Sequence, residues 1–132
     1  SMLHEPHLDF SFSGLKTAVL YTLQREQGRV SVPDLAASFQ QAVIEILVGK
    51  TLKAAKQSRR KIIAVSGGVS LNKALRSAFE SACAAHGYEF VTASPHLCTD
   101  NAAMIAFAAL IRHLQGECSP LNEDIHPNLP LV

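Results

Sequence analysis

Two adjacent glycines after a short apolar run are the residues of this sequence best suited to contact a ligand. Residues 62–65 are apolar and rich in β-branched side chains, which predicts a buried parallel strand. Ser66, Gly67 and Gly68 then predict a tight turn, and we expect a helix from Ser70. Glycines let a ligand approach the backbone, and a helix start offers N–H groups. The pattern matches neither G-x-G-x-x-G nor a Walker A loop, so it fits a nucleotide contact or a plain tight turn.

Two polar residues follow the predicted strand ends. Asn72 falls in the first turn of the expected helix, where its amide can bond a ribose or base edge, or cap the helix. Asp100 follows a second predicted strand at residues 88–93. Its carboxylate can ligate a metal ion or favour the start of a helix through the macrodipole. Because parallel strands end at the same sheet edge, we expect the glycines and Asp100 to emerge side by side.

Serine chemistry is an alternative for the same turn. The pattern Ala-x-Ser-x-Gly around Ser66 approximates a nucleophile elbow, and Asp100 followed by His113 or His126 has the order of a hydrolase triad. An α/β-hydrolase needs a larger sheet than 132 residues of this pattern can build, and His113 falls deep inside a predicted helix. The six histidines include no H-E-x-x-H pair. A serine or metallopeptidase is therefore the weaker interpretation.

The elements that must position these residues alternate in a helix-rich α/β order. Strand, helix and strand in succession predict a small parallel sheet with a crossover connection. Two strands make a poor sheet, so further strands are expected in the first dozen residues or in sequence outside this chain. The expected helices cover residues 14–27, 33–57 and 70–86, with a last one that Ser94 or Thr99 caps and Gly116 closes. We expect an extended lead-in at 1–13, an α/β core at 14–116 and an irregular tail at 117–132.

Composition limits the classes of protein that fit. The chain has 132 residues, 48% of them hydrophobic and 17% charged, with a formal net charge of +1, which suits one domain with a real core. The balanced charge gives no broad basic field for nucleic acid. Three cysteines, an odd number without C-x-x-C spacing, argue against a disulfide framework and a cysteine zinc site. A reducing cytoplasm is the simplest location, and no apolar run is long enough to span a membrane.

Three blocks of sequence carry a family resemblance. They read D-F-S-F-S-G-L-K-T-A-V at residues 9–19, S-G-G-V-S-L-N-K-A-L-R at 66–76 and L-C-T-D-N-A-A-M-I-A at 97–106. Together they resemble the signature blocks of the TsaD/Gcp family, formerly called glycoprotease or O-sialoglycoprotein endopeptidase. The resemblance extends from about Asp9 to Gly116, and order and spacing agree as well. It identifies the chain as similar to the C-terminal part of a TsaD-like domain.

The resemblance implies a fold and a reaction. The fold is that of actin/Hsp70-like ATPases, here as a partial, RNase H-like lobe. The reaction transfers a threonylcarbamoyl group from threonylcarbamoyl-AMP to N6 of the adenosine next to the tRNA anticodon. By motif match, Gly67, Gly68 and Asn72 contact the adenylate, and Asp100 ligates iron or zinc together with two histidines of an upstream H-x-x-x-H motif. Lys16 lies in a signature block without an assigned role.

Partners follow from the same resemblance. The expected partners are tRNA, a TsaB-like paralogue and a TsaE-type ATPase, in the cytoplasm and without a membrane. The H-x-x-x-H motif is absent from these 132 residues, so the chain is expected to hold only part of an active site. Exposed apolar surface on such a part favours a homodimer. The alternative is a truncated binding or assembly module without catalysis.

We therefore predict that residues 1–132 alone have no threonylcarbamoyl transfer activity. One carboxylate is too few ligands for a tight metal site, and the nucleotide site is expected to be incomplete. The measurement is incorporation of the threonylcarbamoyl group into tRNA by the purified chain supplied with threonylcarbamoyl-AMP. Turnover above a no-protein control would contradict the prediction.

Overall fold

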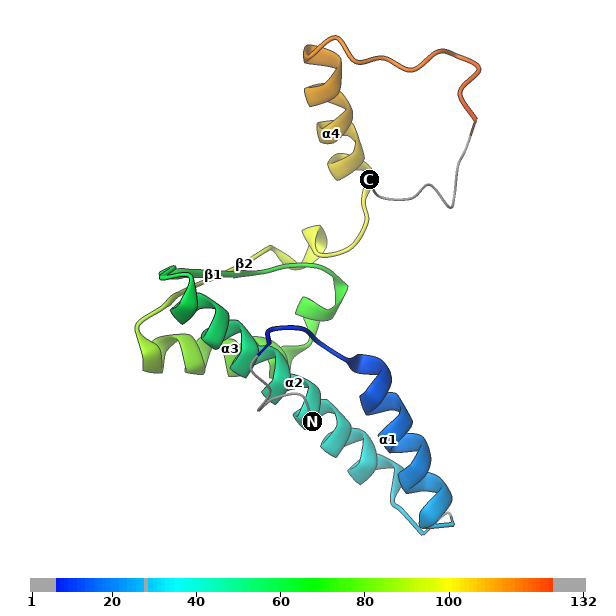
Figure 1. Cartoon of the computed structure of the whole chain (residues 1–132). Coiled ribbons are helices and arrows are strands. Elements are labelled where there is room, and N and C mark those ends of the chain that lie inside the picture. Colours follow the sequence, from blue (N-terminus) through cyan, green and yellow to red (C-terminus); the bar gives the residue numbers. More distant parts are fainter. Residues whose placement is uncertain (1–6, 28, 125–132) are drawn as a thin grey trace. The chain divides into compact units, whose positions relative to one another are not determined.

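The computed structural model describes residues 7–27 and 29–124 of the chain. They divide into two compact units, Ser1–Cys98 and Thr99–Val132, called here the first and second unit. Figure 1 traces the chain through both units. Residues 1–6 of the expected lead-in and residues 125–132 of the expected tail, with His126, lie outside the described residues.

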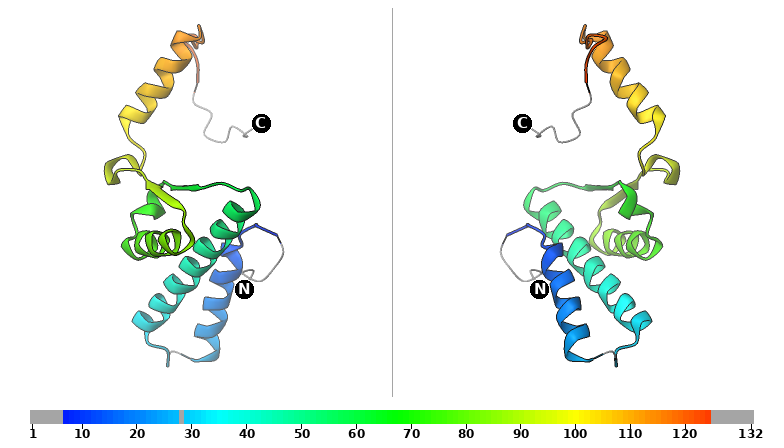
Figure 2. Two further views of the ribbon diagram at one scale, coloured as in Figure 1. Left: turned by 90° about the vertical axis from the view of Figure 1, so that its left-hand side faces the viewer. Right: turned by 90° about the vertical axis from the view of Figure 1, so that its right-hand side faces the viewer.

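The first two helices of the first unit run side by side (Figures 1 and 2). Helix α1 covers Phe12–Arg25, two residues ahead of the predicted start, because the Ser11 hydroxyl caps it by accepting a hydrogen bond from the Gly14 N–H at 3.4 Å. It ends two residues early, and Gln27 beyond it has a left-handed φ of 47°. Helix α2 covers Val32–Gln57, close to the prediction, with a proline in its first turn.

A parallel pair of short strands follows α2. Strand β1 covers Ile62–Val65 and strand β2 covers Glu89–Thr92, in the register that pairs Ile63 with Phe90. Helix α3, Lys73–His86, connects them and ends at Gly87, whose left-handed φ of 69° suits glycine. The predicted strand–helix–strand order and parallel pairing are confirmed.

The core of the first unit lies on one face of this sheet. Figures 1 and 2 show α2 and α3 on the same side of β1 and β2. Phe79 of α3 stacks on Phe90 of β2, with ring centroids 5.7 Å apart. The buried members of the cluster come from α2, β1 and α3: Ile44, Ala55, Ile63, Leu75, Phe79 and Cys83.

The opposite face of the sheet is open among the described residues. Ile62 is 57% exposed and Val91 44% exposed. The prediction of a buried strand at 62–65 is therefore wrong for one face, because helices cover only the side that carries Ile63. Apolar side chains on an uncovered sheet face normally pack against another element.

The second unit contains helix α4, Ala102–Leu114. The Asn101 side chain caps it by accepting a hydrogen bond from the Met104 N–H at 3.0 Å, so the expected capping by Ser94 or Thr99 is wrong. Gly116 follows with a left-handed φ of 81°. The large apolar side chains of α4 are exposed: Met104, Ile105, Phe107, Leu110, Ile111 and Leu114. In the part of the chain that the structure describes, no helix combines the length and apolarity needed to cross a bilayer.

A buried lysine ties the segment before α1 to α2. Lys50 is 1% exposed, and its Nζ donates hydrogen bonds to the carbonyl oxygens of His7, at 3.3 Å, and Asp9. The ammonium also lies 5.9 Å from the ring centroid of Phe10. A buried charge is costly unless it is hydrogen-bonded, and here two carbonyls and an aromatic face offset that cost.

We predict that Lys50→Ala lowers the free energy of unfolding by about 2 kcal/mol, since it removes both hydrogen bonds and the packing of the lysine stem. Lys50→Met keeps the stem volume and should lose less. The matched control is Lys56→Ala on the exposed side of α2, with an expected change within about 0.5 kcal/mol. Urea unfolding followed by circular dichroism measures all three, and equal effects at positions 50 and 56 would contradict the role of Lys50.

Candidate functional site

The loops that follow the two strands meet at one edge of the sheet. Because β1 and β2 are parallel, both chains leave the sheet at their carboxyl ends, where ligands bind in open α/β sheets. The Ser70 hydroxyl, after β1, donates a hydrogen bond to the Cys98 Sγ, after β2, at 3.2 Å. The candidate Asp100 belongs to the second unit. The expected neighbourhood of Asp100 with Gly67 and Gly68 therefore stays a prediction.

The glycine turn has a backbone that favours glycine. Gly67 has φ 87° and ψ 169°, a conformation nearly restricted to glycine. A short 3₁₀ helix, Gly68–Leu71 or η2, follows, closed by hydrogen bonds from the Ser70 N–H to the Gly67 oxygen and from the Asn72 N–H to the Val69 oxygen, both 3.0 Å. The predicted helix start at Ser70 is wrong, because the extended backbone of Asn72 separates η2 from α3.

Asn72 uses both ends of its amide. Its Oδ1 accepts a hydrogen bond from the Leu75 N–H at 3.0 Å and so caps α3, and its Nδ2 donates to Gln40 Oε1 of α2 at 2.8 Å. The cap satisfies a helix N–H that was expected to be available to a ligand. A ligand could bond the amide only by sharing it or by replacing Gln40.

A small cavity opens beside Asn72. Its volume is about 230 Å³, and its wall is mostly apolar, with the amides of Asn72 and Gln40 as its polar groups. Residues of α2, η2 and α3 line it: Phe39, Gln40, Val43, Ile44, Val69, Asn72 and Leu75. Apolar walls with a few polar groups are typical of sites for a planar ring.

Arg76 is a residue of this edge that the sequence did not single out. Its Nε donates a hydrogen bond to the carbonyl oxygen of Ser70, and its Nη2 donates to the carbonyl oxygen of Ala93 at 3.2 Å and to Cys98 Sγ at 3.5 Å. One guanidinium thus contacts both loops. Arg76 is the last residue of the second signature block, and this was the one sequence feature that could have pointed to it. Its spacing within the helix does not distinguish it from an ordinary surface arginine.

The remaining candidates are exposed. Asp100 and Ser66 both lie on the surface. Within the described part of the chain, no group of three His, Cys, Asp or Glu side chains could hold a metal ion, so these residues do not make a metal site by themselves. Among the described residues of the first unit, no histidine hydrogen bonds Ser66, as an elbow serine would require.

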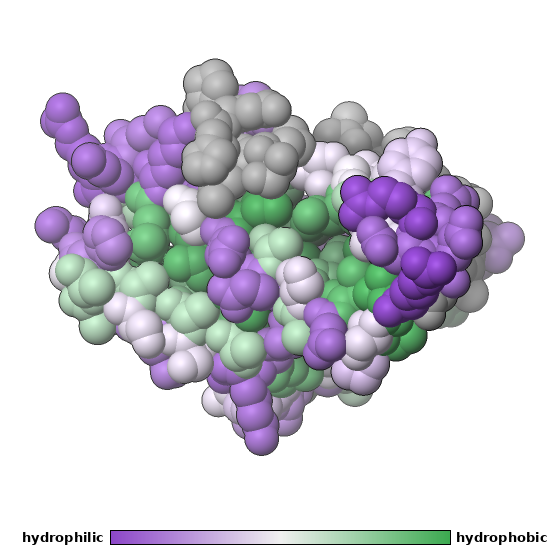
Figure 3. Space-filling model, turned by 90° about the horizontal axis from the view of Figure 1, so that it is seen from below, coloured by the Kyte–Doolittle hydropathy of each residue, from purple (hydrophilic) through white to green (hydrophobic). Residues whose placement is uncertain are grey.

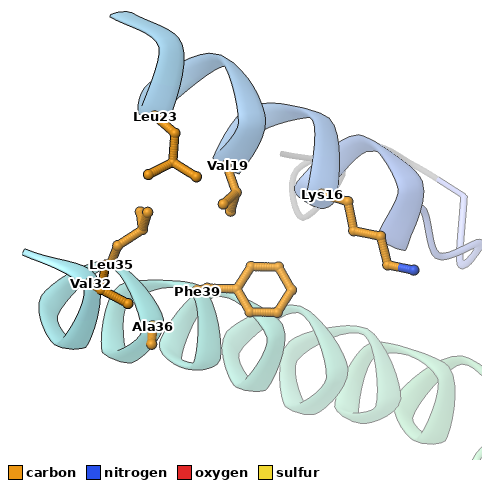
Figure 4. A pocket seen from close by; sticks show the side chains of 7 residues that line it. All are labelled: Lys16, Val19, Leu23, Val32, Leu35, Ala36 and Phe39. Atoms are coloured by element: carbon orange, nitrogen blue, oxygen red, sulfur yellow. The ribbon is translucent and has the colours of Figure 1, made fainter. Parts of the chain in front are cut away.

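Lys16 lies at an open apolar groove away from the glycine turn. The groove, of about 370 Å³, runs between α1 and α2 (Figure 4). Val19 and Leu23 of α1 point toward Leu35 and Phe39 of α2 across it. A space-filling view from below shows apolar surface left open between polar side chains (Figure 3).

Comparison with known proteins agrees with the signature blocks. The pattern of the family described as "TsaD: tRNA N6-adenosine threonylcarbamoyltransferase" matches residues 2–107. The chain belongs to the TsaD family. A protein of Geobacillus thermodenitrificans with that enzyme name is 46% identical over 134 residues, covering 98% of this chain and 39% of its own length. Namesakes in Syntrophotalea carbinolica and Desulfitobacterium hafniense are 45% and 44% identical, and cover 98% and 100% of the chain.

This TsaD chain spans about two fifths of the length of these curated relatives, 39–40%. Its class is the predicted one, a helix-rich portion of the actin/Hsp70-like ATPase fold with a small parallel sheet. Of the three TsaD signature blocks, the first caps and opens α1, the second forms the glycine turn up to Arg76, and the third runs from Leu97 into α4. Leu71 in the second block is 39% exposed.

We predict that Gly67→Ala lowers the free energy of unfolding by about 1–3 kcal/mol, because an L-residue is strained at this φ and ψ. No atom lies within 4 Å of the added Cβ, so strain and not a clash is the cause. Gly68→Ala, at an exposed position without positive φ, is the control and should cost well under half as much. Equal thermal or urea stability of Gly67→Ala and the parent chain would contradict this account.

Proposed function

We propose that this chain forms part of an enzyme that transfers a threonylcarbamoyl group from threonylcarbamoyl-AMP to N6 of the adenosine next to the tRNA anticodon. The observation that carries the proposal is the glycine turn at the carboxyl edge of the parallel strands, within a chain of the TsaD family. Such an edge is where nucleotides bind in open α/β sheets. The enzyme name of the relatives supports the reaction.

We propose that the adenylate lies against the glycine turn. Gly67 and Gly68 present backbone without a Cβ, which lets a phosphate or ribose come close. The cavity of about 230 Å³ beside Asn72 is suited to a flat apolar ring with polar edges. The amides of Asn72 and Gln40, which bond each other at 2.8 Å, supply both a donor and an acceptor for a base or ribose.

The reaction is then an acyl-type transfer. The N6 amine of the tRNA adenosine attacks the carbonyl carbon of the threonylcarbamoyl group, and a new C–N bond forms. The bond from that carbon to the phosphate oxygen breaks, AMP leaves with the electron pair, and the N6 nitrogen loses a proton. In this scheme Gly67, Gly68 and Asn72 hold the adenylate in one orientation, so that the N6 amine meets the carbonyl carbon in a productive geometry.

Asp100 is proposed as one ligand of an iron or zinc ion. A single exposed carboxylate is a donor suited to such a metal, and the described residues contain no group of three His, Cys, Asp or Glu side chains that could hold one. The other protein ligands would come from the H-x-x-x-H motif of the family, which this sequence does not contain.

The setting of the reaction is part of the proposal. Residues 1–132 would act as the C-terminal portion of a TsaD-like domain, with the core at 14–116, in the cytoplasm. The partners would be tRNA, a TsaB-like paralogue and a TsaE-type ATPase. The exposed apolar residues of α4 and of the open sheet face support packing against further protein, including a second copy of the chain.

The test joins this chain to the upstream part of the Geobacillus thermodenitrificans relative, called here the joined protein. We predict transfer activity on tRNA with threonylcarbamoyl-AMP for the joined protein, because it would complete the site. Asp100→Asn should lower kcat by about a hundredfold or more if the carboxylate binds the metal. Asp34→Asn, an exposed acidic residue in the first turn of α2, is the matched control and should leave kcat unchanged.

Asn72→Ser separates the two uses of this side chain. Serine keeps a helix cap but loses the amide donor, so stability should change little while the KM for threonylcarbamoyl-AMP rises about tenfold. An inactive but folded joined protein would favour the assembly module over the transferase. Activity that is unchanged by both Asp100→Asn and Asn72→Ser would remove these residues from the site.

A further inference from the structure

The two loops at the carboxyl edge of the sheet are held together by one compact cluster of side chains. Ser70 is 1% exposed and Cys98 is 4% exposed, and their hydrogen bond at 3.2 Å joins the loop after β1 to the loop after β2. The Ser70 hydroxyl also lies 2.7 Å from the Gly67 oxygen. The cluster therefore reaches directly into the glycine turn.

Arg76 completes this cluster from the first turns of α3. Its guanidinium donates to the Ser70 oxygen on one loop, and to the Ala93 oxygen and Cys98 Sγ on the other. The Cys98 Sγ lies 3.4 Å from the Ser94 oxygen, within its own loop. A planar guanidinium has five donors in a fixed fork, so one side chain can serve acceptors on two segments at once.

We propose that Arg76 is a positioning residue that, with Ser70 and Cys98, fixes the glycine turn and residues 93–98 in one arrangement. The adenylate proposed to lie on the turn would then be held in a set geometry relative to the segment that leads to Asp100. This consequence rests on the proposed function, whereas the arrangement itself does not. Arg76 touches loop backbone and sulfur and is not a catalytic residue.

The three cysteines give a direct test in the chain as it exists. Cys98 is buried in the cluster, Cys83 is 1% exposed in the core, and Cys118 is exposed. Because Cys83 is buried, its thiol is reached only when the core opens, and burial also raises the pKa of this thiol. Alkylation by iodoacetamide can be quantified for each cysteine by mass spectrometry. The rate at Cys98 then reports opening of the loops, the rate at Cys83 reports opening of the core, and the rate at Cys118 reports the reaction of an exposed thiol.

Arg76→Gln should raise the alkylation rate of Cys98 by about tenfold, because the loops lose the shared donor and open locally. Arg76→Lys replaces the planar guanidinium with a single ammonium group and should raise the alkylation rate of Cys98 by less. Cys83 and Cys118 should keep their rates. Arg25→Gln is the matched control, since Arg25 is 77% exposed on α1 and bonds only its neighbour Glu26 among the contacts described.

Two results would overturn the positioning role. Equal increases in the alkylation rates of Cys98 and Cys83 would mean that Arg76 stabilises the whole fold and not the loops in particular. An unchanged alkylation rate of Cys98 would mean that the Arg76 contacts do not keep the two loops together. In the joined protein, Arg76→Lys should lower kcat for transfer by about tenfold while Arg25→Gln does not. Unchanged kcat with a selective rise at Cys98 would overturn the link to the site. A joined protein that is inactive before any substitution would refute the proposed function, and the alkylation result would still decide the arrangement.

Discussion

The parallel pairing of β1 and β2, buried on one face by α2 and α3, is the constraint on which this structure depends. Ile63 and Phe90 face the helices from neighbouring strands, and Phe79 of α3 stacks on Phe90. Helix α3 crosses from the end of β1 to the start of β2, so the two strands run in the same direction. That shared direction places both following loops at one edge of the sheet. Without that pairing, Ser70 and Cys98, which are 28 positions apart in sequence, would have no reason to meet.

The same one-sided burial explains the surface of the chain. Helices cover one face of the sheet, so Ile62 and Val91 remain exposed on the other among the described residues. Helix α4 carries a further set of exposed apolar side chains. The chain spans about 39% of the length of its TsaD relatives, and packing of the open sheet face against further protein belongs to the proposal above.

Local patterns predicted the elements well and the side-chain partnerships poorly. The β-branched run gave strand β1 at its exact bounds, and the stop at Gly87 needs only a residue that tolerates positive φ. The sequence offered Asn72 as a helix cap or a ligand contact, and the structure shows the cap. The separation of η2 from α3 and the cap of α4 at Asn101 depend on which side chain reaches which N–H. Spacing alone does not decide that.

Contacts over long sequence separations were beyond prediction. Lys50 is buried because carbonyls some 41 and 43 positions earlier reach its ammonium, and Arg76 bridges two loops because the strands are parallel. Neither residue differs in type or spacing from an ordinary surface cation. The glycine turn was predicted because two adjacent glycines mark a backbone conformation that other residues rarely adopt. For Asp100, chemistry alone left two uses open, and its role as a metal ligand is a proposal that rests on the TsaD blocks.

The most direct test of the central claim is a crystal structure of the joined protein with a non-hydrolysable analogue of threonylcarbamoyl-AMP. The account predicts the adenylate against the backbone of Gly67 and Gly68, with the Asn72 amide in hydrogen-bonding distance of the nucleoside. An analogue bound elsewhere, with this turn empty, would contradict the claim that the turn after β1 is the adenylate site.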